Sequence, residues 1–183
     1  TLHPLTLEFE RTLEHVTCFL NALESYAGPI VITYPNADTN GHVIIEETNK
    51  FVARHKNAKA VANLGIQAYY SLLKISKAMV GNSSSGIIEA ASFQLPVVNI
   101  GKRQQGRISG ENVIDVQYDS NAISEAVEMV TSTDFKDSIK DIKNPYGDGN
   151  ASGKIAEVLA ASPDKPKLIL KHFNDLKSLK EPL

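Results

Sequence analysis

The sequence predicts an α/β domain, a Rossmann-like, doubly wound parallel sheet with helices on both faces. Two observations lead to this prediction. Short apolar runs of four or five residues alternate along the chain with segments that repeat apolar residues every three or four positions. Several of the short runs are apolar at every position, which is typical of parallel strands buried between two layers of helices.

The first elements are predicted from spacing and from stop signals. Apolar residues at positions 9, 13, 16, 20 and 23 predict a helix over 6–26, which Gly28-Pro29 ends. The β-branched run 30–34 predicts a buried strand that leads into a polar loop. The remaining predicted elements are helix 43–55, strand 60–64, helix 66–77, strand 78–80, helix 84–93, strands 97–100 and 113–116, and helices 121–130 and 151–161.

The length and the composition fit one such domain. The chain has 183 residues, of which 42% are hydrophobic and 22% are charged, as in ordinary globular proteins. The composition changes after Ser162 to a stretch rich in Pro and Lys. We therefore predict a domain over 1–162, followed by a linker and a terminal helix over 163–183.

Charge and cysteine content exclude several classes of function. With 19 Lys and Arg against 21 Asp and Glu, the formal net charge of −2 provides no broad positive field for nucleic acid or for an anionic membrane. Cys18 is the only cysteine, so an internal disulfide or a thiolate zinc cluster cannot form, and we expect a cytoplasmic protein. The longest apolar runs fall far short of the roughly 18–20 residues that cross a bilayer. The chain begins with neither a signal peptide nor Met, so we expect a part of a longer protein.

The segment 81–89 carries the strongest functional signal, because it leads from a strand through a turn of small residues into a helix. Ligands of open parallel sheets bind beyond the carboxyl ends of the strands, where a helix N-terminus offers free N–H groups. Ser83, Ser84 and Ser85 add hydroxyl donors, and Glu89 lies about 7 Å further along the helix. This pattern suits a diphosphate and its ribose. A serine-capped turn with a solvated Glu89 is the alternative that the residue types leave open.

Several known motifs are absent. Ile87 and Ile88 stand where a P-loop requires Lys and Ser or Thr, so the turn is not that of an NTPase. The chain also lacks a Gly-x-Ser-x-Gly elbow, a Gly-x-Gly-x-x-Gly fingerprint and a His-Glu-x-x-His zinc motif.

Three further polar residues follow predicted strands and should reach the same edge of the sheet. Arg103 lies in a basic loop after strand 97–100, and its guanidinium is suited to phosphate. His3 precedes Pro4 at the end of what we interpret as a strand, and Asn36 follows strand 30–34. A solvated loop, a structural histidine and a helix cap are the alternatives for these three residues.

Taken together, these segments resemble the UDP-N-acetylglucosamine 2-epimerase family, and in particular its hydrolysing branch, which serves sialic-acid-type sugar synthesis. The resemblance is carried by the serine turn 81–90, by segment 33–38 and by the loop 101–107, and it runs from His3 to about Leu159. It implies one half of a glycosyltransferase-B-type two-domain fold, namely the C-terminal half that holds UDP.

The resemblance also implies a set of site residues. A UDP site would comprise His3, Asn36, Leu64, Ser83, Ser84, Glu89 and Arg103. In this set Ser83 and Ser84 donate to the diphosphate, Glu89 binds the ribose, and Leu64 contacts the uracil through its backbone. His3 is the one catalytic candidate, because the main carboxylates belong to the N-terminal domain.

The reaction implied is elimination of UDP from UDP-N-acetylglucosamine, followed by addition of water to give N-acetylmannosamine. It needs no cofactor and no metal. The implied partners are UDP, a UDP-N-acetylhexosamine and the N-terminal domain, to which the tail after Ser162 would cross back, and the full-length protein would be a homo-oligomer. This chain alone should be inactive. A nucleotide-sugar glycosyltransferase of the same fold and a non-catalytic nucleotide-binding module remain alternatives.

Overall fold

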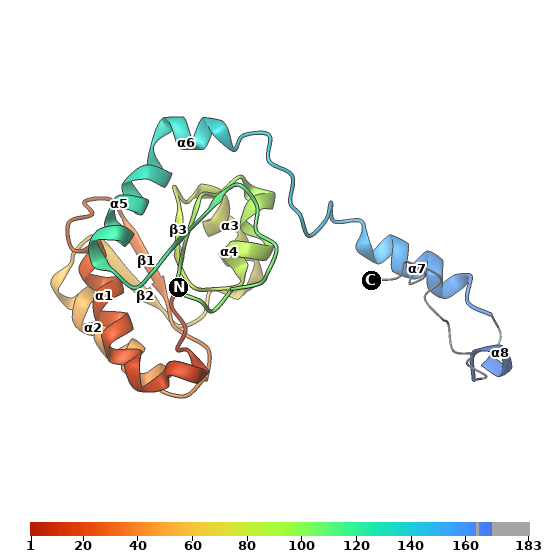
Figure 1. The fold of residues 1–183 in the computed structure, drawn as a ribbon, viewed down its shortest axis with the longest axis horizontal. Coiled ribbons are helices and arrows are strands. Elements are labelled where there is room, and N and C mark those ends of the chain that lie inside the picture. The colour runs from red at the N-terminus through yellow and green to blue at the C-terminus, as the bar shows by residue number, and fades with distance from the viewer. Residues whose placement is uncertain (164, 170–183) are drawn as a thin grey trace, which may run out of the picture. The chain divides into compact units, whose positions relative to one another are not determined.

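The structure is a computed structural model that describes residues 1–163 and 165–169. It consists of two compact units, Thr1–Tyr146 and Gly147–Leu183 (Figure 1). Within the described ranges, no helix combines the length and the apolar character needed to cross a membrane.

The first unit alternates helices and strands. Its elements in chain order are the 3-10 helix η1 (Thr6–Arg11), α1 (Thr12–Leu23), β1 (Ile30–Thr33), α2 (Gly41–Arg54), β2 (Ala58–Val61), α3 (Gly65–Ile75), β3 (Met79–Gly81), α4 (Ser85–Ile88), the 3-10 helix η2 (Ala90–Phe93), β4 (Val97–Ile100), β5 (Val113–Val116), α5 (Ser120–Thr131) and α6 (Thr133–Ser138). The strand pairs β1–β2, β3–β4 and β4–β5 are all parallel. The predicted α/β class is therefore confirmed.

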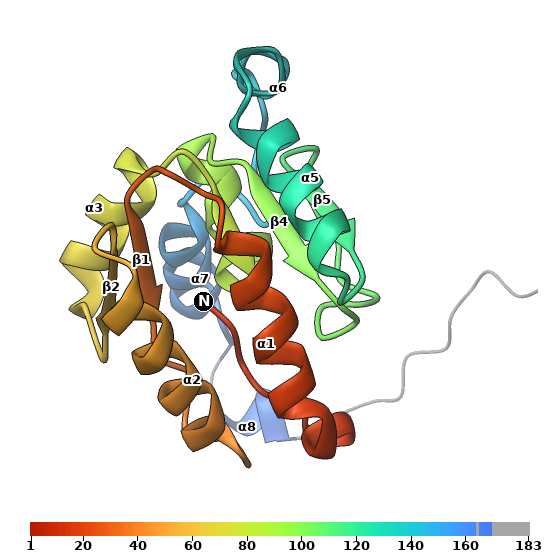
Figure 2. The ribbon, with the colours of Figure 1, turned by 90° about the vertical axis from the view of Figure 1, so that its left-hand side faces the viewer.

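The strands pair as two sheets, whereas the sequence predicted one. One sheet has the order β1-β2 and the other the order β3-β4-β5. In Figure 2, β1 and β2 lie on one side and β4 and β5 on the other, with the N-terminus between them. Thr1 lies beside β3: its amino group donates to the Val80 carbonyl, and the Asn82 amide donates to the Thr1 carbonyl.

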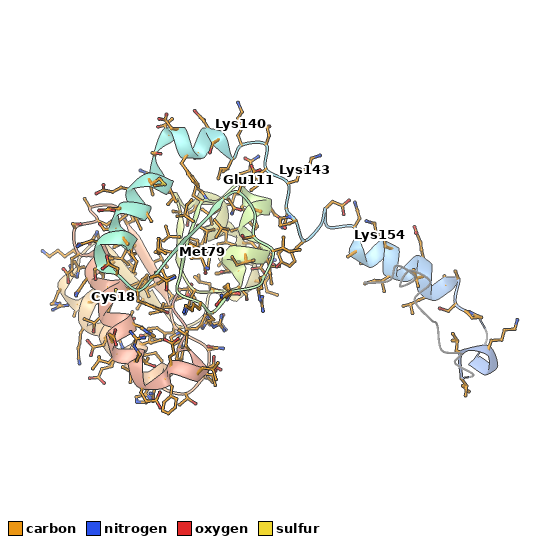
Figure 3. The ribbon with its side chains drawn as sticks, in the orientation of Figure 1. Cys18, Met79, Glu111, Lys140, Lys143 and Lys154 are labelled. Carbon is orange, nitrogen blue, oxygen red and sulfur yellow. The ribbon has the colours of Figure 1, made fainter. Side chains whose placement is uncertain are left out.

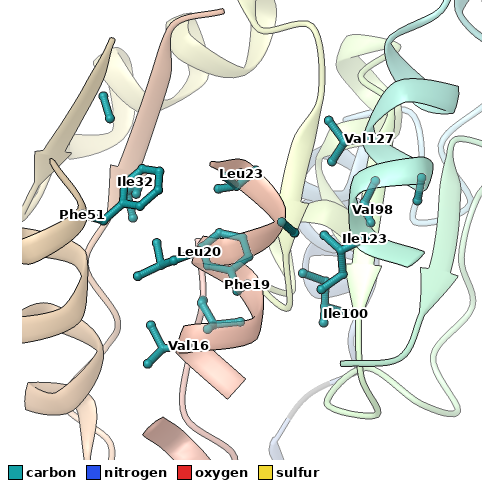
Figure 4. Close-up of a cluster of buried hydrophobic side chains, with 14 of the residues drawn as sticks. Val16, Phe19, Leu20, Leu23, Ile32, Phe51, Val98, Ile100, Ile123 and Val127 are labelled. Atoms are coloured by element: carbon teal, nitrogen blue, oxygen red, sulfur yellow. The ribbon is translucent and has the colours of Figure 1, made fainter. Parts of the chain in front are cut away.

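The main hydrophobic core is organised around α1. Figure 4 shows its side chains between those of β1 and α2 on one side and those of β4 and α5 on the other. The buried residues of α1 in this core are Val16, Phe19, Leu20, Ala22 and Leu23. A second cluster, which includes Leu73 of α3, Met79 of β3 and Leu95, packs separately. Met79 lies inside the first unit, as Figure 3 shows.

The predicted helix 6–26 is wrong in its first turns. Residues 6–11 form a 3-10 helix with a non-helical Glu8, and Phe9 is 39% exposed. A 3-10 helix has three residues per turn, so the apolar positions of the α-helical pattern no longer share one face there.

Other differences are local. The predicted helix 84–93 is broken at Glu89 into α4 and η2. Strand β2 lies about two residues before the predicted 60–64, because Ala58 pairs with Ile30 in the parallel register. Helix α6 was not predicted; it begins at Ser132, whose hydroxyl accepts the Phe135 amide as an N-cap.

The second unit contains α7 (Ala151–Ala160) and α8 (Lys165–Ile169), so the predicted helix 151–161 is confirmed to within one residue. The first compact unit ends at Tyr146. The predicted domain boundary after residue 162 lies further along the chain and stays a prediction. Residues 164 and 170–183 of the predicted terminal tail lie outside the described residues.

Candidate anion-binding site at the sheet edge

Asn82 is the centre of the candidate site. It directly follows β3, and its side chain is completely buried. Its Oδ1 accepts a hydrogen bond of 2.7 Å from the His3 amide, and its Nδ2 donates one of 2.8 Å to the His3 carbonyl. Nδ2 also donates to the Tyr118 hydroxyl at 3.2 Å. Asn82 therefore fixes the segment around His3 beside the serine turn.

The basic loop after β4 is bound to the same residue. Arg103 donates from Nη1 to the Asn82 carbonyl at 3.2 Å, and Gln104 donates from Nε2 to that oxygen at 2.8 Å. Gln104 is buried, whereas the side chain of Arg103 is partly exposed. The structure thus confirms the expectation that the Arg103 loop and the serine turn share one edge of the sheet.

Gly81 permits this close approach. Its φ is +140°, and a Cβ at this position would lie 1.8 Å from the carbonyl oxygen of Thr1. Both the backbone conformation and the space require glycine here.

His3 and Asn36 form a second contact across the edge. The Nδ1 atom of His3 lies 2.8 Å from the side-chain oxygen of Asn36 and 3.2 Å from the Asn36 amide nitrogen. Nδ1 is therefore engaged by Asn36 in either tautomer, and among the described residues Nε2 has no hydrogen-bond partner. Nε2 is the ring nitrogen left for a ligand.

The surroundings of His3 favour its neutral form. Burial is the largest cause that lowers the pKa of His3 below 6.5, and the positive charge of Arg103 lowers it further, while a hydrogen bond to the side-chain oxygen of Asn36 raises it. At neutral pH the imidazole is therefore uncharged, and Nε2 can donate or accept one hydrogen bond depending on the tautomer.

The serine turn presents donors from two residues. Ser83 and Ser84 are partly exposed, and within the described part of the chain their amide N–H groups have no hydrogen-bond partner. Ser85 is 8% exposed, because it is the first residue of α4 and this turn of helix is packed into the domain with Gly86 and Ile87. Its hydroxyl has no hydrogen-bond partner among the described residues, and its role as a donor stays a prediction.

The helix behind the turn is shorter than predicted. Helix α4 has four residues and ends before Glu89, so an anion at this turn would meet local N–H groups and not the dipole of a long helix. Glu89 is partly buried near Tyr69, whose pKa is raised chiefly by burial and less by Glu89. No hydrogen bond within the described residues brings Glu89 to the Asn82 cluster.

Leu64 lies at the carboxyl end of β2, next to the start of α3. The parallel pairing of β1 and β2 places it at the same edge as Asn36. No contact of Leu64 with His3, the serine turn or Arg103 is recorded, so its role stays a prediction.

Sequence reasoning missed the residues that hold the site together. Asn82, Gln104 and Tyr118 come from three loops and meet only in the fold. Behind them, His15 of α1 stacks on Tyr118 with ring centroids 3.8 Å apart and an interplanar angle of 11°. Burial raises the pKa of Tyr118 to about 12, so its hydroxyl keeps its proton at neutral pH. A buried amide that pairs across 79 residues leaves no local signal in the sequence.

The fold and this edge define a class: a Rossmann-like α/β domain with parallel strands, whose polar donors gather beyond the carboxyl ends of the strands. The sequence model of UDP-N-acetylglucosamine 2-epimerase matches residues 1–160. The chain therefore belongs to the UDP-N-acetylglucosamine 2-epimerase family.

Curated relatives agree with this assignment. The chain is 39% identical over 178 residues to a GDP/UDP-N,N'-diacetylbacillosamine 2-epimerase (hydrolyzing) of Campylobacter jejuni, covering 96% of this chain and 46% of the relative. It is 35% identical to a UDP-N,N'-diacetylbacillosamine 2-epimerase (hydrolyzing) of Legionella pneumophila, covering 88% and 41%. Polysialic acid biosynthesis protein P7 of Escherichia coli is 31% identical, with 81% and 38% covered. The chain spans less than half the length of these relatives.

Solved structures confirm the fold. A UDP-GlcNAc 2-epimerase of Methanocaldococcus jannaschii, in complex with UDP-GlcNAc and UDP, matches with a TM-score of 0.64 and 18% identity, covering 86% of this chain and 42% of that one. The enzyme of Neisseria meningitidis bound to UDP-GlcNAc matches with a TM-score of 0.61 and 19% identity, covering 82% and 41%. The chain has the fold of part of these enzymes, in agreement with the predicted half of a glycosyltransferase-B-type fold.

Proposed function

We propose that this chain is the UDP-binding, C-terminal half of a hydrolysing UDP-N-acetylglucosamine 2-epimerase. One observation carries the proposal: His3, the serine turn and Arg103 come from distant parts of the sequence and are joined through Asn82 at the sheet edge. The edge combines free N–H groups, hydroxyls and a guanidinium, and these groups recognise a diphosphate.

The chemistry of this half is to hold and stabilise the leaving group. In the elimination step, a base removes the proton at C2 of the sugar while the bond between C1 and the UDP oxygen breaks, and UDP departs with the electron pair. Water then adds across the double bond, with hydroxyl at C1 and a proton at C2. Ser83, Ser84 and Arg103 stabilise the negative charge that develops on the diphosphate.

His3 has a defined place in this scheme. Its Nδ1 is held by Asn36, so Nε2 would face the departing diphosphate and donate a hydrogen bond to it. The acid and base groups that act on the sugar would come from the N-terminal domain. Glu89 would bind the ribose, and the backbone of Leu64 the uracil.

The proposal extends to the longer protein. Residues 1–162 would form the UDP-binding domain, and 163–183 would cross back to an N-terminal domain that completes the cleft. The full-length protein would act as a homo-oligomer, and this chain alone would bind UDP without turning over UDP-N-acetylglucosamine. The names of the Campylobacter and Legionella relatives support a second candidate substrate, a nucleotide-linked N,N'-diacetylbacillosamine.

Calorimetric titration of the chain with UDP, UMP and UDP-N-acetylglucosamine tests the site. Arg103→Ala should weaken UDP binding about 10- to 100-fold, because a charged hydrogen bond contributes about 1.5–3 kcal/mol. Arg107→Ala is the matched control: it removes the same charge from the same loop, but Arg107 is exposed and its side chain has no recorded bond to the serine turn. Equal affinity of both variants for UDP would refute the site.

The reaction is tested on the full-length protein. We expect release of N-acetylmannosamine and UDP from UDP-N-acetylglucosamine. If the full-length protein consumed only the nucleotide-linked N,N'-diacetylbacillosamine, the proposed UDP site would stand and the proposed sugar substrate would be replaced. Transfer of the sugar to an acceptor would identify a glycosyltransferase, and tight UDP binding without turnover would identify a binding module.

A further inference from the structure

Tyr118 follows β5, and its hydroxyl is bound to the side chain that holds His3. The Nδ2 atom of Asn82 donates one hydrogen to the His3 carbonyl at 2.8 Å and the other to the Tyr118 hydroxyl at 3.2 Å. Asn82 is completely buried, so its amide depends on these partners and not on solvent. The Tyr118 hydroxyl therefore fixes the orientation of the Asn82 side chain, and with it the backbone of His3.

The ring of Tyr118 lies at the start of the loop that carries Arg103. Gly101 directly follows β4 with a φ of +72°, and a Cβ there would lie 2.5 Å from Cε2 of Tyr118. The Gly101 amide donates to the Val116 carbonyl at 2.8 Å, shortly before Tyr118 in the chain. The stack on His15 is a further contact of the ring. The position of Tyr118 is thus set by the same backbone from which the Arg103 loop begins.

His3 and Arg103 are both bound to Asn82, but through different groups. The side chain of Asn82 binds the backbone of His3, whereas its main-chain carbonyl accepts from Arg103. Burial lowers the pKa of His3 and raises that of Tyr118, and the positive charge of Arg103 lowers both values, which places its guanidinium near both side chains. A rotation of the Asn82 side chain would therefore move His3 and leave Arg103 in place.

We propose that Tyr118 is a specificity-determining residue, which favours a nucleoside diphosphate over the monophosphate by fixing the distance between His3 and Arg103. It is a positioning residue and touches no ligand: its hydroxyl holds the amide of Asn82, and this amide holds His3. The inference rests on the proposed function, in which Nε2 of His3 and the guanidinium of Arg103 both contact the diphosphate.

The selectivity follows from the number of phosphate groups. Two linked phosphates can meet His3 and Arg103 together, provided that the two side chains are held at the matching distance. A single phosphate meets only one of them, so its affinity does not depend on that distance. Removal of the Tyr118 hydroxyl should therefore weaken the binding of the diphosphate selectively.

Calorimetric titration of Tyr118→Phe with UDP and with UMP tests the proposal. The variant keeps the ring and loses only the hydroxyl. We expect UDP binding to weaken about 3- to 10-fold, which corresponds to one lost hydrogen bond, and UMP binding to change little. A general loss of stability would lower both affinities equally, so the ratio of the two is the decisive quantity. An unchanged ratio would overturn the proposal.

Tyr34→Phe is the matched control. The Tyr34 hydroxyl also binds an asparagine, since it donates to Oδ1 of Asn49 at 2.6 Å, and the backbone of Tyr34 stays bound to the Val61 carbonyl. This variant should leave the ratio of UDP to UMP affinity as it is in the original chain. An equal fall of the ratio in both variants would overturn the specific role of Tyr118.

A double-mutant cycle shows whether the hydroxyl acts through His3. In a His3→Ala background, Tyr118→Phe should change the affinity for UDP no further. A loss of the same size with and without the His3 side chain would overturn the proposal.

The variants of the Arg103 loop separate this inference from the proposed function. If Arg103→Ala weakens UDP binding more than Arg107→Ala does, and Tyr118→Phe leaves the ratio unchanged, the UDP site stands and the inference about Tyr118 falls. If Arg103→Ala and Arg107→Ala bind UDP equally, the proposed function falls, and the inference falls with it.

Discussion

The side chain of Asn82 and the backbone of His3 form a reciprocal pair of hydrogen bonds across 79 residues: the His3 amide donates to Oδ1 at 2.7 Å, and Nδ2 donates to the His3 carbonyl at 2.8 Å. The carbonyl of the same Asn82 accepts from Arg103 and Gln104. One buried residue therefore sets the relative position of three segments of the candidate site.

Asn82→Ala should lower both stability and ligand affinity. The change leaves the partly buried His3 amide and carbonyl without their partner, which costs about 2–3 kcal/mol in the free energy of unfolding. UDP binding should weaken as well, because His3 is no longer held beside the serine turn. Urea unfolding and calorimetry measure the two effects. Asn21→Ala, an exposed substitution on α1, is the control, and a loss below about 0.5 kcal/mol for Asn82→Ala would contradict the central position of Asn82.

Gly81→Ala should prevent the first unit from folding normally. The added Cβ would lie 1.8 Å from the Thr1 carbonyl oxygen at a φ of +140°, so both the backbone and the contact must change. We expect a loss of about 3 kcal/mol or more, seen as a lower urea midpoint.

The matched control for Gly81→Ala is Gly153→Ala. Gly153 lies inside helix α7, and nothing stands within 4 Å of the position of its Cβ. Alanine there should increase the helical signal in circular dichroism, since it favours a helix by about 0.8–1.0 kcal/mol over glycine. If Gly81→Ala behaved as mildly as Gly153→Ala, the close approach of Thr1 would not exist in solution.

The sequence was sufficient for the class of fold because alternating apolar periodicity is a local signal. The use of local patterns also explains the errors of the sequence-based prediction. The spacing of the apolar residues of α1 continues back to Phe9, yet the chain forms a 3-10 helix over Thr6–Arg11, and Phe9 is 39% exposed. Likewise, the run 84–93 reads as one helix, but it breaks at Glu89.

The residues of the candidate site that would contact a ligand could be predicted from the sequence, whereas the residues that hold them in place could not. Ser83, Ser84 and Arg103 follow strands, so their common edge is a consequence of parallel topology. Asn82 and Gln104 are positioned by contacts between segments that are distant in the sequence. The sequence alone does not distinguish a buried asparagine or glutamine from a solvent-exposed one.

His15→Phe should leave the chain as stable at pH 7 or more stable, by up to about 1 kcal/mol. His15 is 3% exposed, and its Nε2 is buried without a hydrogen-bond partner in the described residues, 3.6 Å from a carboxylate oxygen of Glu8. Phenylalanine keeps the stack on Tyr118 and removes the unpaired nitrogen. Thermal unfolding measures the change, and a loss above about 1 kcal/mol would show that the contact with Glu8 is stabilising.

The stability of the chain 1–183 should fall between pH 8 and pH 6. Burial lowers the pKa of the Thr1 amino group from 8.0 to about 6 in the folded chain, while the unfolded chain keeps a value near 8. In this interval the unfolded chain binds a proton that the folded chain does not, so the free energy of unfolding decreases as the pH falls, by roughly 2 kcal/mol. Urea unfolding at pH 6, 7 and 8 measures the slope.

Acetylation of the N-terminus separates this effect from the histidines. Burial also lowers the pKa values of His3 and His15, and both therefore reduce stability below about pH 6.5 in either form of the chain. The acetylated chain has no amino group to protonate, so its stability should be nearly constant from pH 8 to pH 7, where the free amino form already declines. Parallel curves for the two forms over that interval would mean that the Thr1 amino group does not pair with the Val80 carbonyl in solution.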